Sequence, residues 1–199
     1  MTVTQADKRP VTGGKALVAL GSNATSRFGA PRETLLKALE LLDDEPCRVV
    51  RASGLFLTPF VPAGGGDDVI NAAVLLETGL DAKALLAHLH AIEAAFDRDR
   101  AERWANRTLD LDLIAMGERV LPDRDTLELW INMPPEAQKR DAPDGLVLPH
   151  PRLQDRAFVL VPAAEVAPGW RHPLTGLSIE EMRDALPAED VAAVRPLAV

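Results

Sequence analysis

The chain has 199 residues, enough for one domain with a sizeable core, and its 47% apolar content excludes a disordered chain. Its formal net charge of −8 argues against non-specific nucleic-acid binding, which needs a broad basic surface. The single cysteine, Cys47, excludes an internal disulfide, and no apolar run approaches the roughly 20 residues that cross a bilayer. We therefore expect a cytoplasmic globular protein.

Residues 1–15 are polar, contain Pro and Gly, and lack the apolar core of a signal peptide, so we expect a mobile tail before one domain at 16–199. The apolar run 16–20 predicts a buried strand, which ends at the turn cluster 21–23. A helix is predicted from Pro31, because proline is accepted in a first turn. Leucines recur at helical spacing behind it, at Leu35, Leu36, Leu39 and Leu42.

Two further strands follow. Residues 48–56 predict a strand with an irregularity at Gly54, and residues 69–78, apolar almost throughout, predict a central strand. The glycine-rich loop 63–67 between them is either a plain connector or a lid over substrate. Asn71 lies among apolar neighbours, so its amide must bond either the main chain or a ligand.

Asp81 is a good N-cap for a second helix that we expect to end near Phe96. Its two histidines, His88 and His90, are two residues apart and do not share a helix face, so they do not predict a metal-binding pair. The expected core stripe of this helix is Leu85, Leu86, Leu89 and Ile92.

Residues 108–113 alternate polar and apolar side chains, which predicts a half-buried strand. Asp110 and Asp112 would point the same way, roughly 6.5–7 Å apart. Adjacent carboxylates repel each other unless a cation lies between them, and Mg²⁺ prefers such oxygen ligands. A plain solvated strand face is the alternative. The core side of the strand would carry Leu109, Leu111 and Leu113.

Arginines cluster just before this strand, against the acidic background of the chain. A carboxylate pair for metal and guanidinium groups for phosphate are the parts that a phosphoryl-transfer site requires. The cluster comprises Arg98, Arg100, Arg103 and Arg107.

The predicted order is strand, helix, strand, strand, helix, strand. This is the βαββαβ pattern of ferredoxin-like α+β folds, with a mainly antiparallel sheet and helices on one face. Residues 122–145 form an extra segment, in which Asp125 and Glu128 predict a capping box and a short helix. Residues 146–151 predict a strand and turn, and a C-terminal helix is expected at 178–186. The fold alone implies no function.

The run from Arg103-Trp104 to Arg107-Thr108-Leu109-Asp110-Leu111-Asp112 resembles the signature of the 6-hydroxymethyl-7,8-dihydropterin pyrophosphokinases. The resemblance covers about residues 16–186, apart from 122–145. It is carried further by residues 19–23, Thr58-Pro59, Asn71-Ala72-Ala73, Glu93, residues 149–152 and residues 156–158.

This resemblance implies a Mg²⁺-dependent transfer of pyrophosphate from ATP to the pterin hydroxymethyl group, giving AMP and the pterin diphosphate in folate biosynthesis. It implies that Asp110 and Asp112 hold two Mg²⁺ ions, and that Arg98 and Arg107 neutralise phosphate charge as catalytic groups. The implied ATP-binding residues are Arg98, Arg100, Arg103, Trp104, Arg107, His150 and Arg156.

The same resemblance implies an apolar pterin slot with a few polar anchors, in which Asn71 recognises the ring edge. The implied slot residues are Thr58, Pro59, Val61, Asn71, Trp104 and Phe158. The chain departs from the family at Ala105-Asn106, where Gly-Pro is usual, and at Val69, where an aromatic sometimes stands. The extra segment 122–145, with Trp130 and Ile131, is either a helical flap near the adenine or a packing element.

Two rival functions remain. A ferredoxin-like RNA-binding module would need exposed aromatics and a basic face, which a chain without tyrosine and with net negative charge does not favour. A Mg²⁺-dependent nucleotidyltransferase would release pyrophosphate instead of AMP, so product identity separates it from the pyrophosphokinase. In either enzyme case we expect small-molecule substrates, a monomer, and neither nucleic acid nor membrane as partner.

Overall fold

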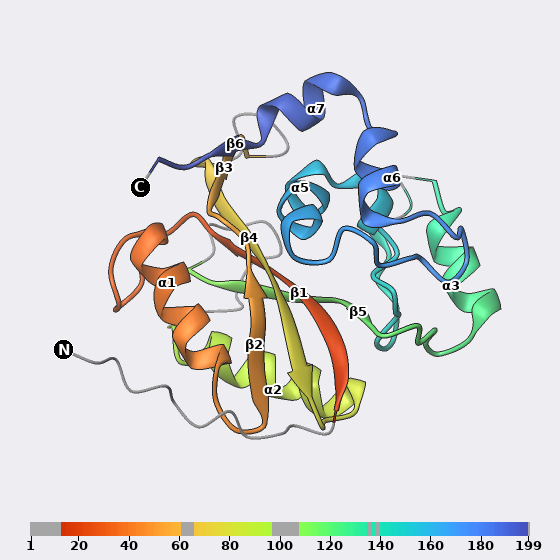
Figure 1. Cartoon of the computed structure of the whole chain (residues 1–199), viewed down its shortest axis with the longest axis horizontal. Helices are drawn as coiled ribbons and strands as arrows, with labels where there is room; N and C mark the ends of the chain where they lie inside the picture. The colour runs from red at the N-terminus through yellow and green to blue at the C-terminus, as the bar shows by residue number, and fades with distance from the viewer. Residues whose placement is uncertain (1–12, 61–65, 97–107, 135–136, 138–139, 199) are drawn as a thin grey trace.

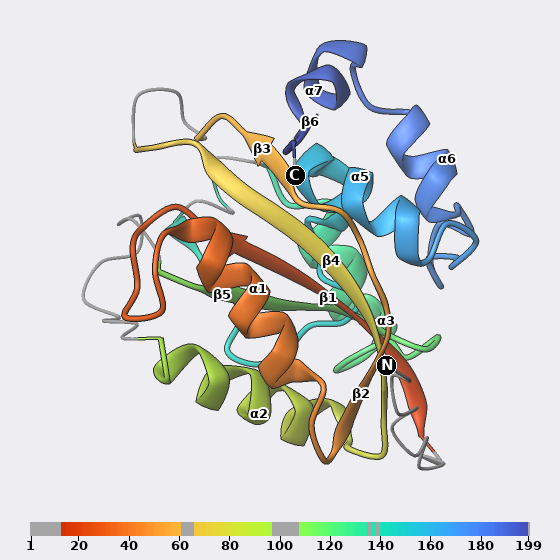
Figure 2. The ribbon, with the colours of Figure 1, turned by 60° about the vertical axis from the view of Figure 1, so that its left-hand side comes forward.

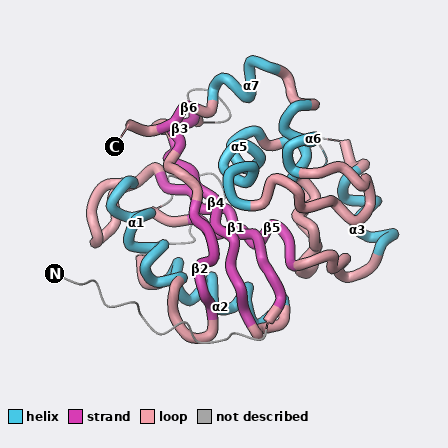
Figure 3. The backbone as a smooth tube through the Cα atoms, viewed as in Figure 1, coloured by secondary structure: helices cyan, strands magenta, loops and turns pink. Residues whose placement is uncertain are grey.

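The structure, a computed structural model, describes residues 13–60, 66–96, 108–134, 137 and 140–198. Within these ranges, one antiparallel sheet runs through the molecule in the order β5-β1-β4-β3-β6, and β2 and β3 follow each other along one edge of β4 (Figures 1 and 3). The strands are β1 (Gly14–Ser22), β2 (Cys47–Ala52), β3 (Phe56–Thr58), β4 (Val69–Thr78), β5 (Asp110–Met116) and β6 (Arg195–Pro196).

The predicted α+β class with an antiparallel sheet is confirmed. The first strand of the βαββαβ pattern, β1, lies between the third and fourth, β4 and β5, and both pairings are antiparallel. Strand β1 begins two residues earlier than expected, and the rest of the predicted tail, residues 1–12, lies outside the described residues.

The strand predicted at 48–56 is divided into β2 and β3, which is a correction. At Ser53 the side-chain hydroxyl accepts a hydrogen bond from the Ala73 N–H at 2.9 Å, in the place of a strand carbonyl. The ladder has already changed register between Val49 and Arg51, so regular pairing ends before Gly54 and resumes at β3.

Helices α1 (Pro31–Leu42) and α2 (Ala82–Ala94) lie together on one face of the sheet (Figure 2). Both begin where they were expected to, and the Asp81 carboxylate caps α2 by accepting from the Ala84 N–H. In α1 the buried stripe is Thr34, Leu35, Ala38 and Leu42. Leu36, predicted as part of the stripe, is 41% exposed.

Helix α5 (Ala157–Val166) covers the opposite face, together with α6 (Ile179–Asp184) and the adjoining short helix α7 (Ala188–Ala193) (Figure 2). The two helices of the predicted βαββαβ pattern thus share one face as expected, whereas the cover that α5 gives to the other face was not predicted. The sequence of α5 is apolar on nearly all sides and contains Pro162, so it shows no amphipathic period that would predict a helix. Its burial between the sheet and α6 explains that composition.

The segment after β5 contains helix α3 (Arg124–Ile131) and, further on, the short helix η1 (Leu153–Asp155). Helix α3 is capped by Asp123, whose carboxylate accepts from the Thr126 N–H at 2.8 Å, and not by the predicted Asp125. Residues 146–151 form no strand, only a bridge between Leu121 and Leu148. Helix α6 confirms the C-terminal helix and has a capping box with Ser178. No helix of the described chain is both long and apolar enough to span a bilayer.

Strand β5 is an edge strand, so part of its main chain faces no neighbouring strand. The buried Glu93 of α2 satisfies one of these groups, because its Oε1 accepts the Leu111 N–H at 2.8 Å. This bond fixes the middle of β5, between the two aspartates, to the helix behind it.

We expect Glu93→Leu to lower the free energy of unfolding by about 1–3 kcal/mol, because the buried Leu111 N–H would lose its acceptor. Denaturant unfolding of the full chain measures this. Glu93→Gln retains an acceptor oxygen and should keep most of the stability. A Glu93→Leu protein as stable as the wild type would contradict the role.

Candidate active site

A cavity of about 700 Å³ opens where the ends of β1, β3, β4 and β5 meet the start of α5. Eight of the side chains proposed from the sequence line it, although they come from distant parts of the chain. They are Thr58, Pro59, Asn71, Asp110, Asp112, His150, Arg156 and Phe158. The other predicted site residues lie outside the described residues: Val61, Arg98, Arg100, Arg103, Trp104 and Arg107.

Asp110 and Asp112 lie on the cavity face of β5, opposite Gly21 and Ala19 of β1. The alternation predicted for this strand is confirmed, because Leu109, Leu111 and Leu113 are each no more than 4% exposed. Both aspartates are half-buried, so their carboxylates border the cavity without being sealed from water. Two carboxylates on one wall of a water-accessible cavity are a donor set that suits Mg²⁺, which binds through one or two carboxylates and keeps waters and phosphates.

Arg156 faces this acidic wall from the residue before α5. Its Nη1 lies 3.7 Å from Asp112 Oδ2, and its guanidinium carbon lies 5.6 Å from the centroid of the Phe158 ring. The contact with Asp112 offsets part of the carboxylate charge, and the ring supports the guanidinium plane. Arg156 therefore places donors for an anion directly beside the carboxylate pair.

Two hydrogen bonds fix the position of His150. Its main-chain N–H donates to the Ile114 carbonyl at 2.8 Å, and its ring Nδ1 accepts the Arg152 main-chain N–H at 3.1 Å. Desolvation, reinforced by the charge of Arg156, lowers the pKa of His150 to about 3. Because Nδ1 is an acceptor, the neutral ring carries its proton on Nε2 and can donate one hydrogen bond.

Asn71 is buried on β4 with its amide nitrogen fully engaged. Nδ2 donates to Thr58 Oγ1 at 2.7 Å and to the Val69 carbonyl at 3.3 Å. The amide nitrogen of Asn71 therefore bonds protein groups, one of them the main chain, while the side chain also lines the cavity. Its carbonyl oxygen faces Gly21, where an added Cβ would stand only 3.3 Å away.

Gly21 is a site residue whose role the sequence did not show. It pairs in register with Asn71 on one side and with Asp110 on the other, so its missing side chain leaves space between the amide and the first carboxylate. The available signal was that this glycine begins the turn cluster 21–23 at the end of β1.

The extra segment also lines the cavity, through Trp130, Asp141, Ala142, Pro143 and Gly145. Of these residues, the sequence singles out Trp130, as part of either a helical flap or a packing element. The stretch from 141 to 145 was missed, because its sequence reads as an ordinary polar turn.

A family model described as 7,8-dihydro-6-hydroxymethylpterin-pyrophosphokinase (HPPK) matches residues 17–168. The chain is 36% identical over 180 residues to a 2-amino-4-hydroxy-6-hydroxymethyldihydropteridine pyrophosphokinase of Pseudomonas aeruginosa, covering 89% of this chain and 94% of that protein. It is 41% identical over 131 residues to the Synechocystis protein of the same name, covering 66% of this chain and 55% of the relative. The chain thus spans about half the length of the Synechocystis relative.

Solved structures of similar fold include wild-type Plasmodium falciparum HPPK-DHPS with pteroate. The TM-score is 0.59 at 12% identity, and the match covers 89% of this chain and 43% of the other. A second HPPK-DHPS structure, in complex with substrates, gives a TM-score of 0.61 at 11% identity, over 87% of this chain and 43% of the other. At these identities the likeness supports the fold.

We expect the ring resonances of His150 to stay unchanged between pH 5 and 8, because its pKa is lowered to about 3. Unfolding frees a ring that titrates near 6.5, so the stability that neutral His150 contributes is present above that pH and is lost as the pH falls toward 3. NMR titration, assigned against His150→Gln, tests the first part. The stability difference between wild type and His150→Gln should shrink on acidification; a constant difference would contradict the pKa shift.

Proposed function

The chain belongs to the 7,8-dihydro-6-hydroxymethylpterin-pyrophosphokinase family, and we propose that it transfers pyrophosphate from ATP to 6-hydroxymethyl-7,8-dihydropterin, releasing AMP, in folate biosynthesis. One observation supports this proposal above all: a single cavity is lined by the carboxylate pair Asp110 and Asp112, by Arg156 and by the buried amide of Asn71. The first two suit a metal-bound triphosphate, and the amide suits the edge of a heteroaromatic ring.

The proposed metal ligands are Asp110 and Asp112, which would hold two Mg²⁺ ions. Their position supports this, because each presents carboxylate oxygens at the cavity wall beside Arg156. Bound there, Mg²⁺ would neutralise triphosphate charge and make the pterin hydroxyl a better nucleophile. The buried leucines on the other side of β5 hold both carboxylates to the cavity, so little reorganisation is needed when substrate binds.

In the proposed complex the phosphates are held by Arg156 and His150. The Arg156 guanidinium has several donors, and its Nη1 stands 3.7 Å from Asp112 Oδ2, so a phosphate bound at the carboxylate pair would lie beside it. Neutral His150 donates from Nε2 without adding charge. The four arginines of the preceding cluster, Arg98, Arg100, Arg103 and Arg107, are proposed to neutralise the remaining phosphate charge, with Arg98 and Arg107 acting in catalysis.

The proposed pterin slot lies between Asn71 and Phe158. Because both Asn71 amide hydrogens are used within the protein, the residue offers its carbonyl oxygen to N–H groups on the ring edge. Phe158 offers a stacking face, and Gly21 leaves room for the ring edge to approach. Thr58 positions the amide. Pro59, Val61 and Trp104 complete the proposed slot.

The partners that we propose are ATP and the pterin alone, bound by a monomeric chain in the cytoplasm. The net charge of −8 and the placement of Arg152 and Arg156 at the cavity support small anionic substrates over nucleic acid.

We expect Asp110→Ala and Asp112→Ala each to lower kcat by roughly 10²–10³-fold or more, because each removes a charged ligand from the transition state. The test incubates the full chain with ATP, Mg²⁺ and the pterin, and separates AMP, ADP, pyrophosphate and pterin products. Asp125→Ala, an exposed carboxylate on α3 that does not line the cavity, is the matched control. Release of pyrophosphate in place of AMP would show a nucleotidyltransferase instead.

We also propose that α3 and residues 141–145 form the adenine side of the cavity, because both line it. Trp130→Ala should raise the KM for ATP by roughly fivefold or more, since stacking a base on an aromatic contributes about 1–3 kcal/mol. The KM for the pterin should hardly change. Leu129→Ala, at a neighbouring residue that is 64% exposed and does not line the cavity, is the control. Equal KM values for ATP in wild type and Trp130→Ala would leave α3 as a packing element.

A further inference from the structure

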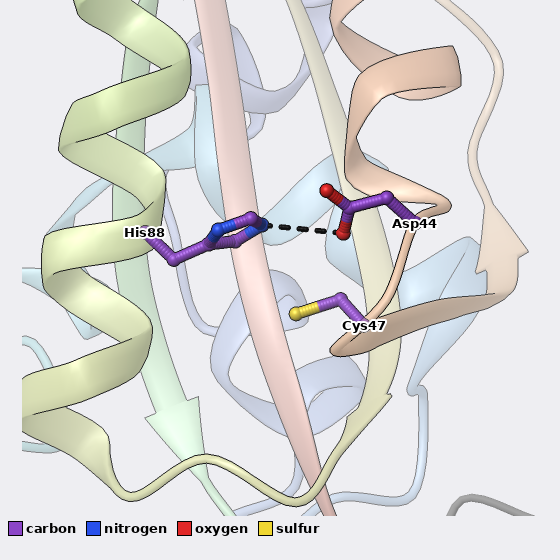
Figure 4. A group of neighbouring side chains, drawn as sticks. All are labelled: Asp44, Cys47 and His88. Atoms are coloured by element: carbon purple, nitrogen blue, oxygen red, sulfur yellow. Dashed lines mark ion pairs between the residues drawn. The ribbon is translucent and has the colours of Figure 1, made fainter.

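Away from the cavity, three side chains with different donor atoms converge between α1, β2 and α2 (Figure 4). Asp44 lies just after α1, Cys47 begins β2, and His88 projects from α2. One carboxylate oxygen, the Cys47 Sγ and one imidazole nitrogen all lie within 4.8 Å of one another. None of the three residues lines the cavity described above.

The imidazole of His88 points a nitrogen into this cluster. Its Nε2 is buried and makes no hydrogen bond within the described residues, yet it stands 3.4 Å from Asp44 Oδ1. A hydrogen bond to a carboxylate is normally shorter, about 2.7–2.9 Å. In a tetrahedral zinc site with Zn–N and Zn–O bonds of about 2.0–2.2 Å, the two ligand atoms stand roughly 3.3–3.6 Å apart. The distance of 3.4 Å between His88 Nε2 and Asp44 Oδ1 falls within this range.

Cys47 supplies the soft ligand. The residue is only 2% exposed, and its Sγ lies 3.6 Å from the Thr78 hydroxyl. Burial raises the pKa of the thiol, the Thr78 hydrogen bond lowers it, and the Asp44 charge raises it again. On metal binding the S–H bond would break, a metal–sulfur bond would form, and the proton would leave to solvent.

We propose that Asp44, Cys47 and His88 bind a thiophilic divalent cation such as Zn²⁺. Thiolate, imidazole and carboxylate are the donors that Zn²⁺ takes, whereas Mg²⁺ takes oxygen ligands alone. Three protein ligands leave a fourth position for water, and Asp44, with 43% of its side chain exposed, opens the cluster to solvent. The cation would tie the turn between α1 and β2 to α2.

The test uses Co²⁺ as a spectroscopic substitute for Zn²⁺ on the metal-free full chain. Because Cys47 is the only cysteine, thiolate-to-cobalt absorption can arise only from this cluster and not from Asp110 and Asp112. We expect this absorption to saturate at one Co²⁺ per chain, to be displaced by Zn²⁺ and to resist excess Mg²⁺. Zn²⁺ should raise the Tm, also in a chain carrying both Asp110→Asn and Asp112→Asn.

Asp44→Asn and His88→Gln should each weaken Co²⁺ binding by at least roughly tenfold, and Cys47→Ala should abolish the absorption. His90→Gln, on the same helix but outside the cluster, is the matched control. Absence of thiolate absorption would overturn the proposal. Absorption unchanged in both Asp44→Asn and His88→Gln would also overturn it, because the thiol would then bind metal alone; this arm holds even if Cys47→Ala fails to fold.

Discussion

The side-chain alternation of β5 is the constraint on which the cavity depends. A strand has a period of two, so burying three leucines on one side forces both aspartates onto the other, whatever their mutual repulsion. A slip of one residue would bury the aspartates and expose the leucines, so the apolar core itself sets the register. The Glu93 bond to Leu111 then holds the edge strand between its two carboxylates. The free energy that supports this arrangement comes from the core, while the acidic wall is its consequence.

The cavity wall carries side chains of both charges. Arg156 Nη1 stands 3.7 Å from Asp112 Oδ2, close enough to offset part of the carboxylate charge. Desolvation, reinforced by the same guanidinium, lowers the pKa of His150 and keeps the ring neutral. The wall therefore combines cationic, anionic and neutral donor side chains, a mixture that accepts a polyanion together with its metal ions better than either charge alone would.

Much of the fold and of the cavity could be predicted from the sequence, because the sequence patterns that specify these elements are local. The alternation at 108–113, the N-cap at Asp81 and the helical leucines of α1 each specify an element within a few residues. What was missed depends on contacts between distant residues. Helix α5 has no amphipathic period because both its sides are covered, and Ser53 ends β2 through a bond to β4. Gly21 gains its role only from its two strand neighbours, and the His88 cluster only from the approach of α1, β2 and α2.

The topology explains why the extra segment lies at the cavity. Strand β5 leads away from Asp110, but the chain must return to the same strand, because the His150 N–H bonds the Ile114 carbonyl. A bridge between Leu121 and Leu148 closes the segment at its base. Residues inserted between Leu121 and Leu148 form a loop closed by this bridge, and lengthening such a loop costs little additional closure entropy. An insertion here can therefore reshape one side of the cavity while the sheet, the carboxylate pair and His150 keep their positions.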